Sequence, residues 1–412
     1  MADSHLNFNA SSKKSSKHVV RHFTPAWFTV IMGTGSIAIL CLNFPYGTQS
    51  PVATYLALAF LFMGLALFLL FTAISVARYT LYPNIWHRMV HHPVQSLYLG
   101  TFPMAAATLL TVSTTAVRET FGLGRSFVYT LWALWWVDVV ISITCFCGTL
   151  HMMKGRQEHP LESMTLRWLL PVVTLIVVSS TGGVIAPVIT AYSPSGALIT
   201  VTFCVCMVSV ALPVVMMMLT IYLLRCTVYG YPQGSLILSS IFPLGPFGQS
   251  AYAILLIGSA LRSIIPESFG DAQGLFQSAT TPIIVQTFCV MIALALWAFE
   301  TMWLVFALLA MRHAVNNEGR FSFQLSFWGL IFPNGVYANI TIILGSTFSS
   351  NFFRVFGAAY AVATFLLWLY VFVQTVRVLP SGRIFESSPD EKEIAEESVS
   401  NTVSIDADKT QP

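Results

Sequence analysis

Ten long apolar stretches follow one another between residues 25 and 377. A helix needs about 20 mainly apolar residues to cross the hydrocarbon core of a bilayer, and only helices or closed barrels satisfy their backbone groups there. Only 9% of the residues are charged, against about 25% in an ordinary soluble domain. The sequence therefore predicts an all-α polytopic membrane protein. Its predicted transmembrane helices are 25–43, 53–77, 95–116, 126–150, 168–191, 198–224, 236–261, 281–311, 323–347 and 354–377.

Glycine and proline residues interrupt alternate spans. A proline inside a helix removes a backbone hydrogen bond and bends the helix. In a membrane, such a break is tolerated where the helix is buried in protein or lines a water-filled cavity. The second, fourth, eighth and tenth spans have no internal proline, and the sixth has only Pro213. We therefore predict five helical hairpins, each with one kinked inner helix and one plain outer helix, around a central pore.

The interruptions supply the candidate residues for the gate and lining of this pore. A Phe-Pro pair occurs in three of them, and its ring could close the lumen beside the kink. Two simpler interpretations stay open: glycine and proline often serve only helix packing in membranes, and the rings could fill the bundle core. The candidates are Gly33, Thr34, Gly35, Phe102, Pro103, Gly182, Gly183 (with Pro187 one turn on), Phe242, Pro243, Phe332, Pro333 and Asn334.

Basic residues are distributed unequally between the two sides of the predicted bundle. An even number of spans places both termini on one side. Of the 20 Lys and Arg residues, only Arg118, Arg125, Arg262 and Arg354 fall on the other side. Because cytoplasmic loops carry the excess of basic residues, both termini are predicted to be cytoplasmic.

The sequence divides into three predicted segments. Residues 1–21 form a polar, basic N-terminus, residues 22–378 the ten-helix transmembrane domain, and residues 379–412 an acidic tail. Neither terminal segment has enough apolar residues to fold alone, so both are predicted to be disordered. No segment is left for a soluble catalytic domain, and no nucleic-acid partner is expected.

Few side chains within the spans carry charge. Asp138 and Glu300 both lie on plain helices. We therefore expect structural roles, such as helix-to-helix hydrogen bonds or an oligomer contact, with proton coupling as the alternative. No Lys or Arg lies mid-span, so hydroxyl and amide groups and backbone N–H groups at the kinks remain to face a solute. Such a path binds small anions weakly, which suits rapid conduction. The polar candidates are Thr34, Ser36, Thr101, Ser240, Gln249 and Asn334.

Cysteine and histidine give little sign of a metal or cofactor site. The seven cysteines all fall in or at the ends of apolar runs and are interpreted as small buried apolar residues. His87, His91 and His92 cluster before the third span, where a surface role is favoured over metal binding or pH sensing. No metal and no cofactor is predicted.

Four segments resemble a known family. They are HFTPAWFTVIMGTGSIAILCLNFPY at 22–46, HHPVQSLYLGTFPM at 91–104, STGGVIAP at 180–187 and IFPLGPFGQ at 241–249. They are similar to the fungal sulfite efflux pumps, which belong to the tellurite-resistance and dicarboxylate transporter family. Bacterial TehA-type channels and plant slow anion channels are members of the same family. The resemblance covers roughly residues 21 to 378.

The resemblance implies a ten-helix fold with quasi-fivefold symmetry and an anion pore lined by the inner helices. It implies that Phe332, directly before Pro333 on the ninth span, occludes this pore. It also implies a homo-oligomer in the lipid of the plasma membrane, a trimer in the bacterial and plant branches, with a dimer left open here. The expected activity is export of sulfite or bisulfite, and the alternative within the family is a dicarboxylate (malate) transporter or another small-anion channel. A receptor or scaffold, or a membrane enzyme, is less well supported, since the sequence offers neither a partner-binding domain nor clustered ligands in the spans.

Overall fold

The computed structural model describes residues 16–47, 51–269, 280–319, 321–381 and 384, and these ranges contain helices but no strand. Within these ranges, ten helical segments are long and apolar enough to cross a membrane. The all-α polytopic prediction is therefore confirmed, although α9 (Pro194–Tyr229) is longer than predicted by about a turn at each end, and the helices Pro51–Leu81, Arg125–Gly155 and Thr281–Glu318 are longer by a turn or more at their C-terminal ends. Most of the two predicted disordered tails lies outside the described residues; α1 (Ser16–His22) begins inside the N-terminal one.

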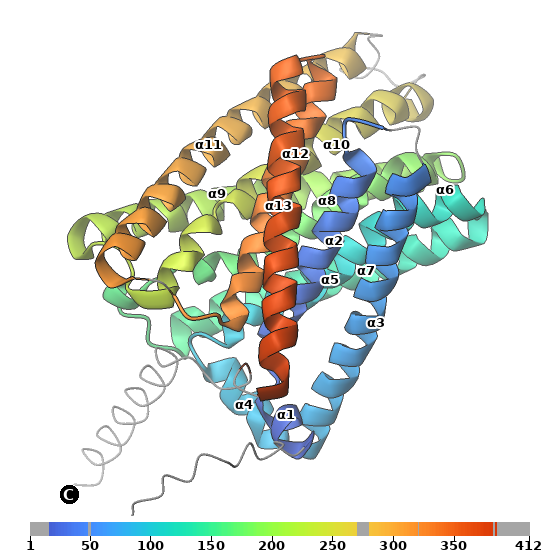
Figure 1. Cartoon of the computed structure of the whole chain (residues 1–412). Coiled ribbons are helices and arrows are strands. Elements are labelled where there is room, and N and C mark those ends of the chain that lie inside the picture. Colours follow the sequence, from blue (N-terminus) through green and yellow to red (C-terminus); the bar gives the residue numbers. More distant parts are fainter. Residues whose placement is uncertain (1–15, 48–50, 270–279, 320, 382–383, 385–412) are drawn as a thin grey trace, which may run out of the picture.

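Five inner helices alternate with five outer helices along the chain (Figure 1). In the most apolar window of each inner span, between 78 and 89% of the residues are buried, against 22 to 39% in the outer spans. The predicted separation into an inner and an outer set is thus confirmed. The inner helices are α2 (Phe28–Asn43), α5 (Thr101–Val112), α8 (Leu170–Thr190), α10 (Leu244–Phe269) and α12 (Ile331–Thr347); the outer helices are α3 (Pro51–Leu81), α7 (Arg125–Gly155), α9 (Pro194–Tyr229), α11 (Thr281–Glu318) and α13 (Asn351–Val378).

The inner helices close into a ring. Each contacts two others, in the order α2, α5, α8, α10, α12 and back to α2, and each packs against the outer helix that follows it. The start of α1 and the end of α13 lie at the same end of the bundle, together with α4 (Pro83–His91) (Figure 1). The ring confirms that the inner helices surround a common axis; its quasi-fivefold symmetry stays a prediction.

Each inner span begins with a short 3-10 helix that passes directly, or within two residues, into the α-helix. These 3-10 helices are η1 (Pro25–Trp27), η2 (Ser96–Gly100), η5 (Leu166–Leu169), η6 (Gly234–Ile241) and η8 (Leu325–Leu330). Pro103, Pro171 and Pro333 then fall in the first turn of an α-helix, where the N–H groups have no intrahelical partner. These prolines therefore begin the α-helices and do not break them.

The predicted interruptions at Gly33–Gly35 and at Gly182–Gly183 are wrong. Both lie inside continuous helices, α2 and α8. These glycines permit close approach: a Cβ on Gly33 would lie 3.0 Å from Ile331 Cβ, and one on Gly183 would lie 2.8 Å from Leu256 Cβ. The packing interpretation of these residues is the one that the structure supports.

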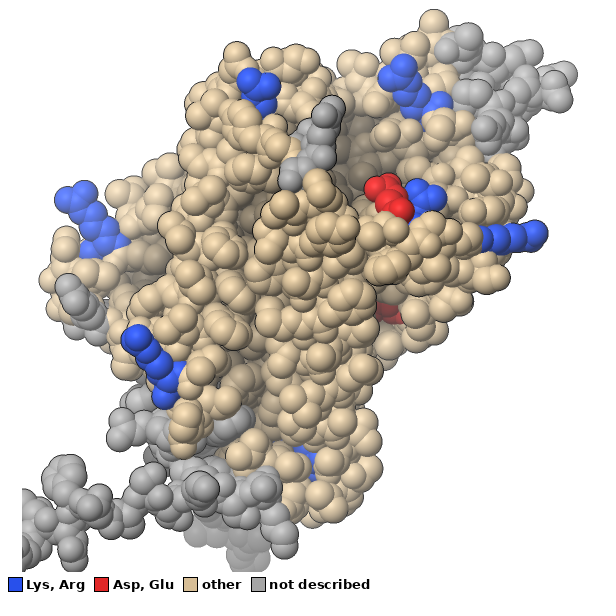
Figure 2. Space-filling model, turned by 45° about the vertical axis from the view of Figure 1, so that its right-hand side comes forward, with Lys and Arg blue, Asp and Glu red and all other residues tan. Residues whose placement is uncertain are grey.

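Charged side chains are sparse on the molecular surface. Figure 2 shows one face whose centre is almost free of them, with Lys and Arg mostly toward its edges. Long apolar side chains on the outer helices, such as Leu69, Phe288 and Leu366, are well exposed. Such a surface is suited to hydrocarbon contact, as expected for a ring of lipid-facing helices.

Candidate functional site

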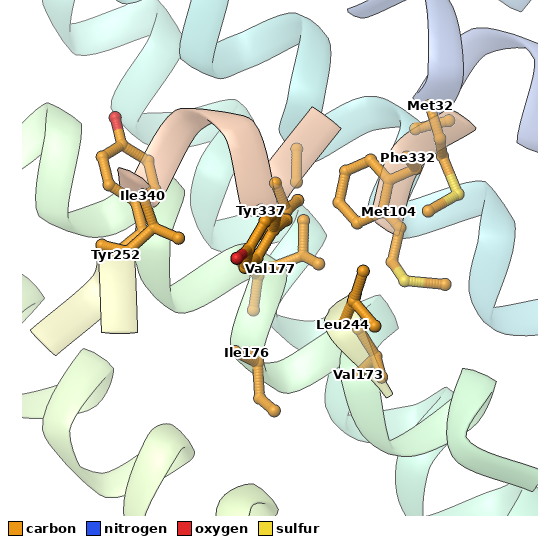
Figure 3. Packing of buried hydrophobic residues seen from close by; sticks show 14 of the residues in the cluster. Met32, Met104, Val173, Ile176, Val177, Leu244, Tyr252, Phe332, Tyr337 and Ile340 are labelled. Carbon is orange, nitrogen blue, oxygen red and sulfur yellow. The ribbon is translucent and has the colours of Figure 1, made fainter. Parts of the chain in front are cut away.

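Phe332 lies between two small cavities on the axis of the inner ring. Its side chain lines both of them, and it is 6% exposed. Figure 3 shows its ring beside Met32 of α2 and Met104 of α5. Gly329 and Gly245 also line the first cavity, and the lack of a side chain on Gly329 leaves room for the ring of Phe242, which lines it too. The geometry makes Phe332 the partition between the two spaces.

The first cavity, here called the apolar cavity, lies on the side of the 3-10 helices. Its volume, measured as the space that the centre of a water-sized sphere can occupy, is about 40 Å³. All five inner spans contribute to it, and almost every contributed side chain is apolar. Its lining residues are Thr29, Met32, Met104, Leu169, Leu170, Val173, Phe242, Gly245, Pro246, Trp328, Gly329, Phe332 and Pro333.

The second cavity, here called the polar cavity, lies deeper along the same helices. It leaves about 20 Å³ for the centres of water-sized spheres. All five inner helices contribute again, but hydroxyl and amide groups now take part. Its lining residues are Ser36, Ile39, Thr108, Thr111, Val177, Gln249, Tyr252, Phe332, Gly335, Val336 and Asn339.

The polar groups of this cavity are mostly engaged with the helices that carry them. Ser36 Oγ donates to Gly33 O at 2.8 Å, and Thr108 Oγ1 donates to Met104 O at 2.7 Å. Gln249 donates to Ser180 Oγ. Asn339 Oδ1 accepts from Asn43 Nδ2 at 2.7 Å, which leaves the NH₂ group of Asn339 as the donor available to a solute. The cavity is thus polar without a formal charge.

The two cavities together form a closed path. A single water needs about 10–15 Å³ by this measure, so the apolar cavity admits a few waters and the polar cavity about one. Neither admits a hydrated anion, and an apolar constriction also disfavours a continuous water column. Passage along the axis therefore requires Phe332 to move, while the surrounding groups offer only weak, uncharged contacts.

The structure places only some of the predicted pore residues at these cavities. Phe332 and Pro333 line the apolar cavity, and so does Phe242. Pro243 lies between η6 and α10 and lines neither. Asn334 faces α13, where it accepts from the hydroxyl of Tyr360 and donates to Leu330 O at 2.7 Å.

The remaining predicted pore residues line neither cavity, and most face other helices. Phe102 packs 5.2 Å from Phe28 and 5.3 Å from Phe68, measured between ring centroids. Thr34 accepts from Trp368 Nε1 at 3.2 Å. The others in this group are Pro103, Gly33, Gly35, Gly182 and Gly183.

The prediction included Gln249 but missed Asn339, the other amide that lines the polar cavity. Gln249 follows Phe242 by seven residues, and Asn339 follows Phe332 by seven. Seven residues make about two helical turns, so Phe332 and Asn339, both in α12, share a face of that helix. An amide seven residues after a Phe-Pro phenylalanine, as Gln249 is, is therefore the sequence signal that would have located Asn339.

The two carboxylates within the spans lie away from the cavities. Asp138 on α7 and Glu300 on α11 are buried between an outer helix and the inner ring. The predicted helix-to-helix hydrogen bonds are absent, since among the described residues neither carboxylate has a hydrogen-bond partner. Glu300 packs over Gly248, where any side chain would overlap it. Close packing at this glycine thus takes the place of the expected polar contact.

The histidine cluster organises the loop before η2. The rings of His87 and His91 stack with centroids 4.2 Å apart. His92 Nδ1 accepts from the backbone N–H groups of Val94 and Gln95 at 3.1 and 3.2 Å. Burial lowers the pKa of His92, which favours the neutral ring that this acceptor role requires.

Comparison with known proteins places the chain in a family of membrane channels and transporters. A family model described as SLAC1, voltage-dependent anion channel, matches residues 22–376. The chain is 33% identical over 377 residues to the sulfite efflux pump SSU1 of Trichophyton rubrum, covering 90% of this chain and 95% of that protein. It is 26% identical to the SSU1 pump of Candida albicans, covering 84 and 72%. It is 21% identical to the malic acid transport protein of Schizosaccharomyces pombe, covering 87 and 78%.

Proposed function

Because the chain belongs to the SLAC1 family of voltage-dependent anion channels, we propose that it is a sulfite or bisulfite exporter and gives its cell tolerance to sulfite. The similarity to sulfite efflux pumps over nine-tenths of the chain supports this substrate. The site supports the proposed transport because it is a closed, uncharged path in which Phe332 separates the apolar cavity from the polar cavity. The position of Phe332 between these two cavities is the observation on which the proposed mechanism depends.

The driving force needs no nucleotide or other cofactor. An inside-negative membrane potential favours the exit of one negative charge by about 2.3 kcal/mol per 100 mV. The protein's task is then to open a selective path when required. Phe332 leaves the axis, the anion loses part of its hydration, and hydroxyl and amide groups such as Asn339 replace it weakly. This is transport and not catalysis.

We place the protein in the plasma membrane with both termini in the cytoplasm. The distribution of basic residues supports this orientation, since only four of 20 lie on the side opposite the termini. The outer helices expose apolar side chains to lipid. A homo-oligomer is proposed from the family resemblance, as a trimer or a dimer.

A dicarboxylate substrate is the alternative. The similarity to a malic acid transport protein supports it, at lower identity. The site argues against it, because none of the residues that line either cavity is cationic. A doubly charged substrate loses more hydration in such a path than a singly charged one.

The test is a flux comparison in vesicles that contain the purified protein. Sulfite, nitrate and malate are each loaded at the same concentration, and efflux is followed under a potential set by potassium and valinomycin. We expect sulfite to leave fastest and malate slowest. Faster efflux of malate would favour the dicarboxylate alternative, and efflux equal to that of empty vesicles for all three would refute the proposal.

A further inference from the structure

A third cavity, here called the vestibule, opens beyond the polar cavity. It leaves about 410 Å³ for the centres of water-sized spheres, roughly twenty times the space in the polar cavity. It lies where α12 ends and α13 begins, at the end of the bundle opposite α1 (Figure 1). A space of this size holds a hydrated anion, which the two axial cavities do not.

Polar side chains and one positive charge line part of the vestibule. Ser346, Ser349, Ser350 and Asn351 line it together with Arg354. Arg354 is exposed and donates to Asn351 Oδ1 at 2.9 Å, which holds the guanidinium near the cavity. No acidic residue is among those that the structure places in the lining. The vestibule is therefore a suitable place for an anion.

Consecutive turns of the same two helices connect the polar cavity to the vestibule. On α2, Ile39 lines the polar cavity and Asn43 lines the vestibule, one turn further. On α12, Asn339 lines the polar cavity, and Ile342 and Ile343 line the vestibule. A step of three or four residues along a helix is about 5–6 Å. The two spaces are thus neighbours along one helix pair.

One hydrogen bond crosses between these two spaces. Asn43 Nδ2 donates to Asn339 Oδ1 at 2.7 Å, so the two side chains join α2 to α12 at the boundary. Each amide also has groups left over that can bind a solute, since one amide offers two N–H donors and an acceptor. An anion that separates the pair would exchange this hydrogen bond for contacts with both NH₂ groups.

We propose that the anion leaves the polar cavity between α2 and α12, through the Asn43–Asn339 amide pair, and enters the vestibule beside Arg354. The amide pair is then a second, polar gate in series with Phe332, and Arg354 selects for anions at the mouth. This inference rests on the proposed anion transport. It goes beyond it by naming the exit route and the residues that determine selectivity there.

Electrostatics sets the expected size of the effect of Arg354. A unit charge about 8 Å from an anion in water changes the local anion concentration roughly two- to threefold at low salt. At about 0.5 M salt the Debye length is shorter than that separation, so the effect should largely vanish. A purely structural role of Arg354 would not produce this salt dependence.

The test measures sulfite and chloride efflux from the same vesicles at low and high salt. Arg354→Gln should lower both fluxes about two- to threefold at low salt only, while Arg354→Lys should retain them. Arg262→Gln is the matched control, since Arg262 lies at the same end of the bundle and also donates to an amide, that of Gln286, at 2.7 Å. Equal effects of Arg354→Gln and Arg262→Gln, or an effect that salt leaves unchanged, would overturn the role of Arg354.

A chemical replacement of the charge separates electrostatics from folding. Ser346→Cys is added to Arg354→Gln, and the new thiol is treated with methanethiosulfonates that attach either a trimethylammonium or a sulfonate group. The cationic group should restore the flux and the anionic group should lower it further. The Arg354→Gln variant that keeps Ser346 corrects for reaction of the exposed native thiols of Cys147 and Cys206. Equal responses to the two reagents would contradict the proposal.

The amide gate has its own pair of variants. Asn43→Asp places a negative charge at the boundary and should reduce anion flux about tenfold or more, since charges a few ångströms apart interact strongly in a partly buried site. Asn43→Ala removes the pair and should leave the flux equal or raised. Equal losses in the two variants would exclude this route. Failure of the proposed function itself is a separate outcome, because the wild-type protein would then release sulfite no faster than empty vesicles do.

Discussion

Replacing Phe332 by alanine tests the axial gate most directly. The ring is buried between the two axial cavities, so moving it aside in the wild type exposes its apolar surface. Full exposure of such a side chain costs about 1.5–3 kcal/mol. At equilibrium this cost leaves about one molecule with the ring moved aside for every ten to a hundred molecules with the ring in place. Phe332→Ala removes this requirement and should raise anion efflux about tenfold to a hundredfold.

The same substitution also carries a cost in stability. Truncation of a packed phenylalanine lowers the free energy of unfolding by about 3–5 kcal/mol, and the space already present beside Phe332 argues for the low end of that range. Thermal unfolding of the detergent-solubilised protein measures this loss, and anion efflux from vesicles measures the gate. The gate predicts higher flux together with lower stability.

Phe102→Ala is the matched control. Phe102 also precedes a proline at the start of an inner helix, but it packs against Phe28 and Phe68 and lines neither cavity. This variant should lose stability without gaining flux. The reasoning would be refuted if both variants raised the flux equally, or if Phe332→Ala lost stability while its flux stayed at the wild-type level.

Three further predictions follow from contacts outside the gate. Gly35→Ala should destabilise the protein by about 1–3 kcal/mol, because the added Cβ would overlap Thr108 Cγ2. Adding Thr108→Ser should restore much of this loss in thermal unfolding, and Gly148→Ala, which has open space around it, should be neutral or stabilising. Burial lowers the pKa of His92, so the stability that its neutral ring contributes is present above pH about 6.5 and lost below it. The His92→Asn variant, whose amide oxygen can still accept from the N–H groups of Val94 and Gln95, should show a weaker pH dependence of unfolding than the wild type. An identical pH dependence would count against this role. Glu300→Gln should leave sulfite efflux and its pH dependence unchanged because Glu300 lines neither axial cavity, and loss of that pH dependence would instead reveal proton coupling.

The alternation of inner and outer helices could be predicted because it has two strong signals in the sequence. Apolar length marks the spans, and the positions of proline and glycine separate the two sets. The location of the breaks could not be predicted in the same way. A proline in the first turn of a helix and a proline in its middle look alike in sequence, and the 3-10 helices that precede Thr101 and Ile331 have no distinctive composition.

The faces of the inner helices were harder still to predict. A helix that is buried on all sides has no polar stripe to mark which side faces the axis. Phe102 and Phe332 are both the second residue of an α-helix and both precede a proline, yet only Phe332 lines the axial cavities. The difference comes from distant residues: aromatic rings on α2 and α3 pack against Phe102, while Phe332 borders a cavity that Gly245 and Gly329 also line.

The surroundings of Phe332 indicate how the gate can open. Hydrogen bonds fix the start of the inner helices, since Thr101 Oγ1 donates to Pro25 O at 2.8 Å and Trp328 Nε1 donates to Thr375 Oγ1 at 2.8 Å. Rotation of the Phe332 side chain breaks none of these bonds, whereas a tilt of an inner helix would break several, each worth about 1 kcal/mol. A change of rotamer is therefore the less costly opening motion. In the proposed mechanism, the Phe332 ring moves while hydrogen bonds of Trp328 and Asn334 keep the rest of the stretch from Ser326 to Tyr337 in place.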